Sequence, residues 1–206
     1  MTEVGVNCFA MTVEDSVRKL GSIGKPMMRT EVPLVEADGQ DVGDDAVGEM
    51  WFRGPHVSLG YWNRPDATAE VCREDGWFRS GDLARRDADG FFFIAGRAKE
   101  MIISGGVNVY PAEIEAVLLQ HPAVRDAAVV GVEDATWGEA GVAFVVALER
   151  DALAEAELLA FLSERLARFK LPKAFAFLDE LPRTAYGKVV KGELRTRYLA
   201  ARKDPA

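Results

Sequence analysis

The chain has 206 residues, of which 49% are hydrophobic and 28% charged, so it can form one large domain or two small ones around a real core. Its formal net charge of −8 argues against sequence-independent binding of nucleic acid. Two cysteines without a CxxC spacing indicate neither a disulfide framework nor a zinc site, and they favour a cytoplasmic location. No apolar run reaches the ~20 residues of a membrane span, and no signal-peptide pattern begins the chain.

Residues 1–98 are punctuated by glycine and proline, which predicts short strands joined by turns. Strands are predicted at residues 32–35 and 49–52 by their β-branched and aromatic content. A short helix is predicted to begin at Arg64-Pro65. The turn Asp89-Gly90 is expected to lead into a buried strand at residues 91–95. We therefore expect a β-rich region.

The pattern changes after Gly96, where helices and strands begin to alternate. A helix is predicted to begin at Pro111, because proline is favoured at the first helical position. Leucines at positions 158, 159, 162 and 166 predict a second, amphipathic helix. The remaining predicted elements are strands at 101–103, 127–132, 142–148 and 175–178 and a final helix at 192–199. The fold class is therefore α+β, with a β-rich first domain at residues 1–98 and a compact α+β domain at 99–206.

Two segments of the first region could bind a nucleotide. Asp82 follows a glycine, and such a carboxylate can accept two hydrogen bonds from the vicinal hydroxyls of a ribose. The alternative for Asp82 is an ordinary Asx-type turn. Arg97 and Lys99 follow the predicted strand at 91–95, where Arg97 could hold a nucleotide. The alternative for this pair is a solvated charge run.

Two segments of the second region could also carry chemistry. Gly105 and Gly106 would let a ligand approach the backbone closely, although a plain strand-to-helix turn explains them equally well. Lys188 follows Gly187 on a loop, so it could neutralise charge that develops in a transition state. The alternative for Lys188 is an exposed basic tail. Lys191, three residues further on, serves as a comparison residue that is not expected to share this role.

Together, the order and spacing of these segments resemble the closing motifs of the adenylate-forming, or AMP-binding, superfamily. This superfamily includes acyl- and aryl-CoA synthetases, luciferases and peptide-synthetase adenylation domains. The resemblance covers essentially the whole chain and starts at Met1-Thr2-Glu3, which is similar to the end of the Tyr-Gly-Met-Thr-Glu motif of the family. Its other motifs are residues 60–65, 75–82 and 96–115. Residues 102–115, 137–139 and 169–173 look most like fatty-acyl-CoA synthetases.

The resemblance implies two half-reactions at one site. A carboxylic acid, here a fatty acid, attacks the α-phosphate of ATP, and coenzyme A then displaces AMP from the acyl-adenylate. It implies that Thr2 contacts the α-phosphate, that Glu3 helps to hold Mg²⁺, and that Asp82 binds the ribose hydroxyls with support from Arg97.

The resemblance also assigns the residues of the second region. Lys188 would bridge the substrate carboxylate and the nucleotide during adenylation. Lys99 would be the hinge about which the second domain rotates between the half-reactions, and Gly105 and Gly106 would then face the pantetheine arm of coenzyme A. Such a rotation would let one site serve both steps while excluding water.

The sequence also departs from the family. The Ser/Thr/Gly-rich loop that wraps the pyrophosphate and most of the acyl pocket are not in this chain, which suggests a fragment or an internal methionine taken as the start. We expect this chain alone to show no carboxylate-dependent exchange of pyrophosphate into ATP. The first 23 residues are expected to lack packing partners, so that exposed Val4, Val6, Phe9 and Met11 drive disorder or self-association. The alternatives are an aryl-CoA ligase and a non-catalytic binding or interaction module.

Overall fold

The computed structural model describes residues 1–5, 8–36, 39–149 and 153–203. The chain divides into two compact units, Met1–Lys99 and Glu100–Ala206, one residue after the boundary proposed from the sequence. Among the described residues, no helix is long and apolar enough to cross a membrane.

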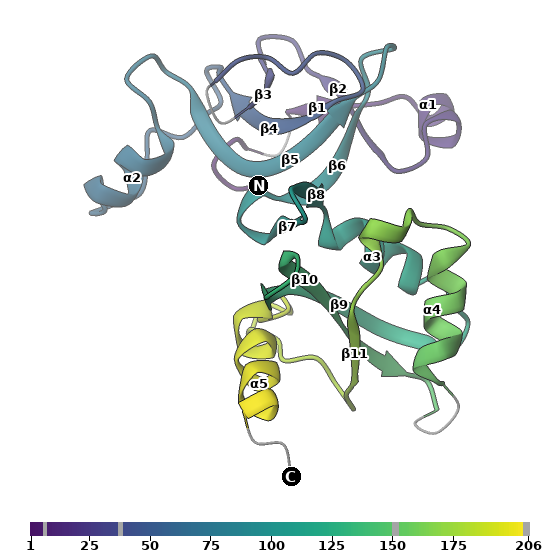
Figure 1. Ribbon diagram of the computed structural model, residues 1–206. Coiled ribbons are helices and arrows are strands. Elements are labelled where there is room, and N and C mark those ends of the chain that lie inside the picture. Colours follow the sequence, from purple (N-terminus) through teal and green to yellow (C-terminus); the bar gives the residue numbers. More distant parts are fainter. Residues whose placement is uncertain (6–7, 37–38, 150–152, 204–206) are drawn as a thin grey trace. The chain divides into compact units, whose positions relative to one another are not determined.

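The first unit is built on a six-stranded antiparallel sheet in the order β1-β2-β6-β5-β4-β3 (Figure 1). Its strands are β1 (Phe9–Ala10), β2 (Ser22–Pro26), β3 (Leu34–Val35), β4 (Val47–Phe52), β5 (Phe78–Arg86) and β6 (Phe92–Arg97). Two short helices, α1 (Val13–Arg18) and α2 (Pro65–Val71), contain no buried residue. The sheet therefore supplies the core of this unit.

The start of the chain packs onto this core. Val4 is 1% exposed and belongs to the same buried cluster as Leu34 and Phe52. The Phe9 ring lies 6.1 Å from the Phe52 ring and 5.1 Å from the Phe92 ring, centroid to centroid. The expectation that the N-terminal segment lacks packing partners is therefore wrong for Val4 and Phe9, because strands within this chain cover them. Val6 lies outside the described residues.

Met11 is half-buried, so it does not add a fully exposed apolar side chain to the segment. The large apolar side chains exposed in the described part of this segment are instead Met1, the α1 residues Val13 and Val17, and Leu20 just after α1. Self-association through Val4, Phe9 and Met11 therefore loses its physical basis.

The second unit combines a mixed sheet with three α-helices. In the sheet, β10 lies between β11 and β7, β8 follows β7, and β9 also pairs with β10. Among the strand pairs described in this sheet, β10 and β11 are parallel and the others are antiparallel. The strands are β7 (Ile102–Ser104), β8 (Val107–Val109), β9 (Val124–Asp134), β10 (Gly138–Ala147) and β11 (Ala174–Phe177). The helices are α3 (Pro111–Leu118), α4 (Glu155–Ser163) and α5 (Lys191–Lys203), with 3₁₀ turns η1 (Ala98–Glu100) and η2 (Arg168–Lys170).

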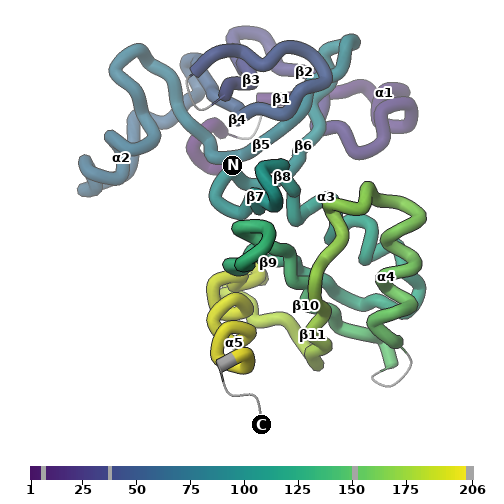
Figure 2. Tube along the Cα trace, viewed as in Figure 1, coloured from purple at the N-terminus to yellow at the C-terminus, as the bar shows by residue number. Residues whose placement is uncertain are grey.

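Helices cover both faces of the β9–β10 ribbon, as the tube in Figure 2 also shows. On one face, α3 and α4 pack their buried leucines and isoleucine against Val129, Ala143 and Val145. On the other face, α5 packs Leu194 against a cluster that includes Phe144. Burial of each such side chain stabilises the fold by about 1.5–3 kcal/mol. The turns that carry Gly105, Gly106 and Lys188 belong to this three-layer unit.

Candidate functional site

Asp82 and Arg97 form an ion pair on neighbouring strands of the first unit. They are register partners on β5 and β6, and Arg97 Nε lies 2.6 Å from Asp82 Oδ1. The side chain of Asp82 is 17% exposed and that of Arg97 is 54% exposed. This close ion pair ties the Asp82 carboxylate to the neighbouring strand. Two residues from separate sequence motifs are thus brought together.

An irregular stretch of backbone places Asp82 on β5. Gly81 has a φ of +70°, which favours glycine, and its N–H donates to Glu49 Oε1 at 2.9 Å. The Ser80 hydroxyl donates to the Met50 carbonyl at 2.6 Å and accepts the Asp82 N–H at 3.0 Å. The β4–β5 register shifts between Glu49 and Trp51. Asp82 therefore lies within a paired strand whose local shape is set by Ser80 and Gly81.

Thr2 and Glu3 lie at the start of the same unit. Glu3 is tied down through its carbonyl, which accepts the Ser58 N–H at 2.7 Å, and through Oε1, which accepts the Tyr61 hydroxyl at 3.0 Å. Burial raises the pKa of Tyr61, and its hydrogen bond to Glu3 raises it further. The side chain of Thr2 is exposed, and its carbonyl accepts the Gly5 N–H at 3.3 Å.

The donor set fits a magnesium ion that arrives with a phosphate. Within the part of the chain that the structure describes, no group of three or more His, Cys, Asp and Glu side chains could hold a metal. Magnesium needs only one or two protein carboxylates when phosphate oxygens complete its coordination. Glu3 could supply one such ligand.

In the second unit, Gly105 and Gly106 form the turn between β7 and β8. Both have positive φ, +58° and +81°, which disfavours any residue with a side chain. The Gly105 N–H donates to the Trp137 carbonyl at 2.8 Å, and a Cβ at this position would lie 2.9 Å from Trp137 Cε3. A Cβ on Gly106 would meet nothing within 4 Å. Of these two glycines, only Gly105 has a neighbour, Trp137, so close that a side chain would collide with it.

Lys188 lies on a hydrogen-bonded turn. The Gly187 N–H donates to the Thr184 carbonyl at 2.9 Å, and the Thr184 N–H donates to the Lys188 carbonyl at 2.8 Å. The Lys188 N–H donates to Thr184 Oγ1 at 3.2 Å. The side chain of Lys188 itself is exposed. The exposure of Lys188 agrees with the alternative of an exposed basic tail, although the backbone of this loop is hydrogen-bonded on both sides of the lysine.

Two cations that the sequence analysis did not assign to the site flank this turn. Arg183 donates to the Gly187 carbonyl at 2.6 Å and to Asp126 Oδ2 at 2.5 Å. Lys191 is paired with two carboxylates and is not an isolated surface lysine. It is therefore unsuitable as a neutral comparison for Lys188. The carboxylate partners Asp126, Glu100 and Glu115 are far away in the sequence, so no local pattern reveals these ion pairs.

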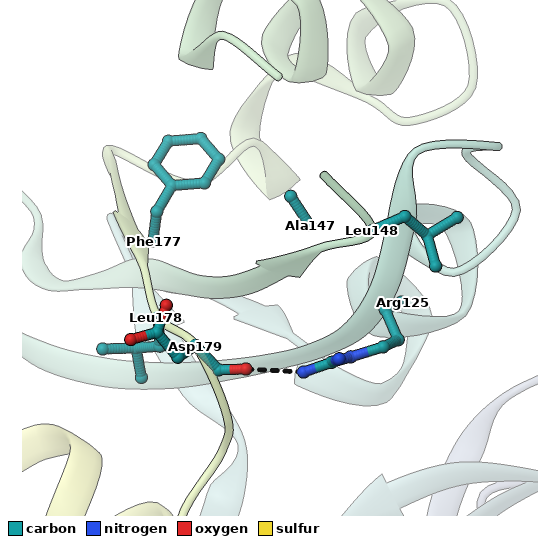
Figure 3. Close-up of a pocket in the computed structure, with 6 residues that line it drawn as sticks. All are labelled: Arg125, Ala147, Leu148, Phe177, Leu178 and Asp179. Carbon is teal, nitrogen blue, oxygen red and sulfur yellow. Dashed lines mark hydrogen bonds between the residues drawn. The ribbon is translucent and has the colours of Figure 1, made fainter. Parts of the chain in front are cut away.

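A pocket of about 280 Å³ lies elsewhere in the second unit (Figure 3). It is lined by Arg125, Ala147, Leu148, Phe177, Leu178 and Asp179. Arg125 donates to the Asp179 carbonyl at 2.5 Å across its edge. This pocket lies where β10 and β11 end, whereas the Gly105 turn adjoins the start of β10 at Gly138. None of the site residues predicted from the sequence lines it.

Two family models match the chain. Residues 1–62 match the model described as AMP-binding enzyme, and residues 113–188 match the AMP-binding enzyme C-terminal domain. Their order agrees with the two units, and residues 63–112, which include Asp82, Arg97 and Gly105, lie between the two matched ranges. The chain belongs to the AMP-binding superfamily and corresponds to its C-terminal part.

Within this superfamily, the chain is similar to several CoA ligases and synthetases. The chain is 47% identical over 198 residues to a feruloyl-CoA synthase of Amycolatopsis, covering 96% of this chain and 40% of that protein. It is 50% identical over 189 residues to an indoleacetate–CoA ligase of Aromatoleum aromaticum, covering 92% and 36%. The o-succinylbenzoate CoA synthetase of Bacillus subtilis, solved with its acyl-adenylate intermediate, superposes with a TM-score of 0.88 at 40% identity. That alignment covers 95% of this chain and 40% of that one.

The chain thus spans about 40% of the length of these relatives. The same Bacillus subtilis synthetase has also been solved with ATP and a magnesium ion. By their names, these relatives act on aromatic carboxylic acids. They are not long-chain fatty-acid ligases, so the expected fatty-acyl branch is not supported.

Proposed function

We propose that this chain forms part of an AMP-forming acid–thiol ligase that converts an aromatic carboxylic acid into its CoA thioester. The observation that carries the proposal is the Asp82–Arg97 ion pair, 2.6 Å long, in a chain 40% identical to a synthetase solved with an acyl-adenylate. A carboxylate held in this way can accept both hydroxyls of a ribose. Arg97 lies opposite Asp82 on the neighbouring strand, and its guanidinium holds the carboxylate in place.

The remaining residues of the first unit are proposed to act on the phosphates. Thr2 has an exposed hydroxyl that can donate to the α-phosphate. Glu3 is held by Ser58 and Tyr61 and offers its second carboxylate oxygen to a magnesium ion. When bound, that ion would offset the charge of the departing pyrophosphate. These roles require no dedicated metal cage in the protein.

The second unit is proposed to serve both half-reactions in turn. Lys188 would bring its ammonium to the substrate carboxylate and the α-phosphate while the two anions react. Gly105 and Gly106 would face the pantetheine arm of coenzyme A in the thioester step, where the absence of side chains permits a close approach. Lys99 lies at the division between the units and is the proposed hinge, with residues 1–98 belonging to the large domain and residues 99–206 forming the rotating one.

An aromatic substrate is favoured over a fatty acid by the identities of 46–50% to feruloyl-, succinylbenzoate- and indoleacetate-CoA ligases. The reaction would use ATP, Mg²⁺ and coenzyme A and would release AMP and pyrophosphate. We further propose that it takes place in the cytoplasm, in keeping with the cysteine content. A purely non-catalytic module is less well supported, because it has no need for Asp82, Arg97 and Lys188 together.

The test is a chimera in which this chain replaces the corresponding part of the Bacillus subtilis o-succinylbenzoate CoA synthetase. We expect ATP- and CoA-dependent thioester formation from o-succinylbenzoate, strongly reduced by Asp82→Asn and by Lys188→Ala. Arg195→Ala, which removes an exposed cation from α5, is the matched control and should leave the rate unchanged. A folded chimera in which Asp82→Asn equals its parent would refute the assignment.

The substrate class needs a separate assay, since the acyl pocket of a chimera comes from the other protein. The complete reading frame that contains this chain should be assayed for AMP release with ferulate, indoleacetate and o-succinylbenzoate beside palmitate. Preference for palmitate would overturn the aromatic assignment and leave the ligase assignment intact.

A further inference from the structure

Lys191 contacts two carboxylates from different parts of the second unit. Its Nζ lies 2.5 Å from Glu100 Oε2 and 2.9 Å from Glu115 Oε1. The side chains of Lys191 and Glu115 are 22% and 18% exposed, and that of Glu100 is 40% exposed. The cluster is thus half-enclosed, so solvent screens these pairs less than it screens pairs on the open surface.

The place of Lys191 in its helix calls for an explanation. It is the first residue of α5, where the partial positive charge of the helix N-terminus disfavours a cation by about 0.3–1 kcal/mol. Burial alone lowers the pKa of Lys191, but hydrogen bonds to Glu100 and Glu115 outweigh burial and raise the pKa. A residue type that is unfavourable for its local secondary structure, and whose cost is offset by tertiary contacts, often marks a functional position.

Each partner of Lys191 ties it to a different structural element. Glu100 is the first residue of the second unit and directly follows Lys99. Glu115 belongs to α3, and its Oε1 also accepts the Val129 N–H of β9 at 2.7 Å. Lys191 therefore joins the start of the unit, the α3–β9 core and the start of α5.

Lys191 also follows the Lys188 turn immediately. The turn is closed at its base by two backbone interactions. The Val190 N–H donates to the Pro182 carbonyl at 2.8 Å, and Arg183 and Val189 form an isolated antiparallel β-bridge. The chain leaves this base directly into Lys191. Whatever holds Lys191 in place therefore holds the C-terminal side of the turn.

We propose that Lys191 is a positioning residue, which fixes the Lys188 turn to Glu100 and Glu115 so that this unit carries Lys188 as one rigid body. The role of Lys188, and that of Lys99 beside Glu100, rest on the proposed function. With the cluster intact, Lys188 would keep a fixed position within the second unit while that unit rotates at Lys99. Without it, the ammonium of Lys188 would sample a wider range of positions, and even about 1 Å of misplacement can cost on the order of 10² in rate.

The first test needs no enzymatic activity and uses the 206-residue chain without ligand. Amide hydrogen exchange of Gly187 and Lys188, both hydrogen-bonded to Thr184, is measured by NMR. We expect exchange about tenfold faster in Lys191→Met, because a charged hydrogen-bond cluster is lost. Lys191→Arg should restore protection.

Lys170→Met is the matched control. Lys170 is 23% exposed and pairs with Glu113 of α3 at 2.6 Å, so it is a lysine–glutamate pair of equal burial that does not border the turn. Unchanged exchange in Lys191→Met, or equal acceleration in Lys170→Met, would overturn the proposal. If Lys191→Met does not fold, Glu100→Gln and Glu115→Gln decide by the same measurement, since each removes one partner.

The second test uses the complete ligase. Lys191→Met should slow adenylation about tenfold or more, whereas thioester formation from supplied acyl-adenylate should change less than twofold. Equal losses in both half-reactions would show a merely structural role. A complete protein with no ligase activity would refute the proposed function, while the exchange result would still stand.

Discussion

The glycine turn between β7 and β8 allows a prediction whose size follows from the structure. At Gly105, alanine would have to adopt a φ of +58°, which costs about 1–2 kcal/mol for a residue with a Cβ. Its Cβ would also lie 2.9 Å from Trp137 Cε3, so the indole must move. Trp137 is 46% exposed and can yield, and the overpacking adds about 1–3 kcal/mol. We therefore expect Gly105→Ala to cost about 2–5 kcal/mol.

Gly106→Ala isolates the backbone part of this cost. Gly106 has a φ of +81° and no atom within 4 Å of its would-be Cβ, so only the backbone cost of about 1–2 kcal/mol remains. The free energy of unfolding of each variant is measured by urea titration, followed through NMR signals of β9 and β10, which report on the second unit alone. The gap between the two glycines should be about 1–3 kcal/mol.

A double-mutant cycle with Trp137→Ala completes the test. Without the indole, Gly105→Ala should cost as much as Gly106→Ala, because the backbone strain is then the common term. Equal costs at the two glycines in the chain that retains Trp137 would refute the reasoning. A gap that persists in the Trp137→Ala background would refute it as well.

Three further outcomes are expected. Lys188→Ala should slow adenylation by about 10²–10³, with thioester formation from acyl-adenylate much less affected, and equal losses in both steps would contradict its role. Arg183→Met removes the donor to the Gly187 carbonyl, so adenylation should fall about tenfold in a stopped-flow assay; an unchanged rate would show that the turn holds its shape alone. Burial raises the pKa of Asp87, but hydrogen bonds from Lys19 and a backbone N–H outweigh it and hold the pKa below 3.8. Their stabilisation is present above that value and is lost as the pH falls through the lower folded-state pKa. Lys19→Met should therefore raise the pKa of Asp87 in an NMR titration, and an unchanged pKa would contradict the pairing.

The sequence predicts the second unit better than the first. The β-branched runs within β9 and β10 and the proline at the start of α3 carry strong local signals. The α+β fold class is confirmed by the structural similarity to the synthetase of Bacillus subtilis. In the first unit, β5 has the sequence Phe-Arg-Ser-Gly-Asp-Leu-Ala-Arg-Arg, whose polar residues show no period of two. Pairing with β4 and β6 makes it a strand, and a single sequence cannot show such pairing.

The functional site, like the fold, can be predicted from the sequence only in part. The resemblance to a family, rather than the chemistry of any one segment, indicated residues such as Asp82 and Lys188. The structure adds the 2.6 Å contact between Asp82 and Arg97. The cluster of Lys191 could not be found from the chain alone, because Lys191 and Glu100 are 91 residues apart. The predicted helix at 192–199 does not include Lys191, so its place at the first position of α5 is known only from the structure.

The two apolar faces of the β9–β10 ribbon affect how its register is chosen. In a sheet with one solvent-exposed face, a register shift of one residue would expose the apolar side chains and bury the polar ones. Here helices cover both faces, so a slip would merely exchange one apolar set for the other, and polarity cannot discriminate between the registers. Side-chain volume must do so, because Ala143 faces α3 and α4 while its neighbour Phe144 faces α5. Interior size complementarity, rather than the hydrophobic–polar pattern, is thus what selection must preserve along this strand.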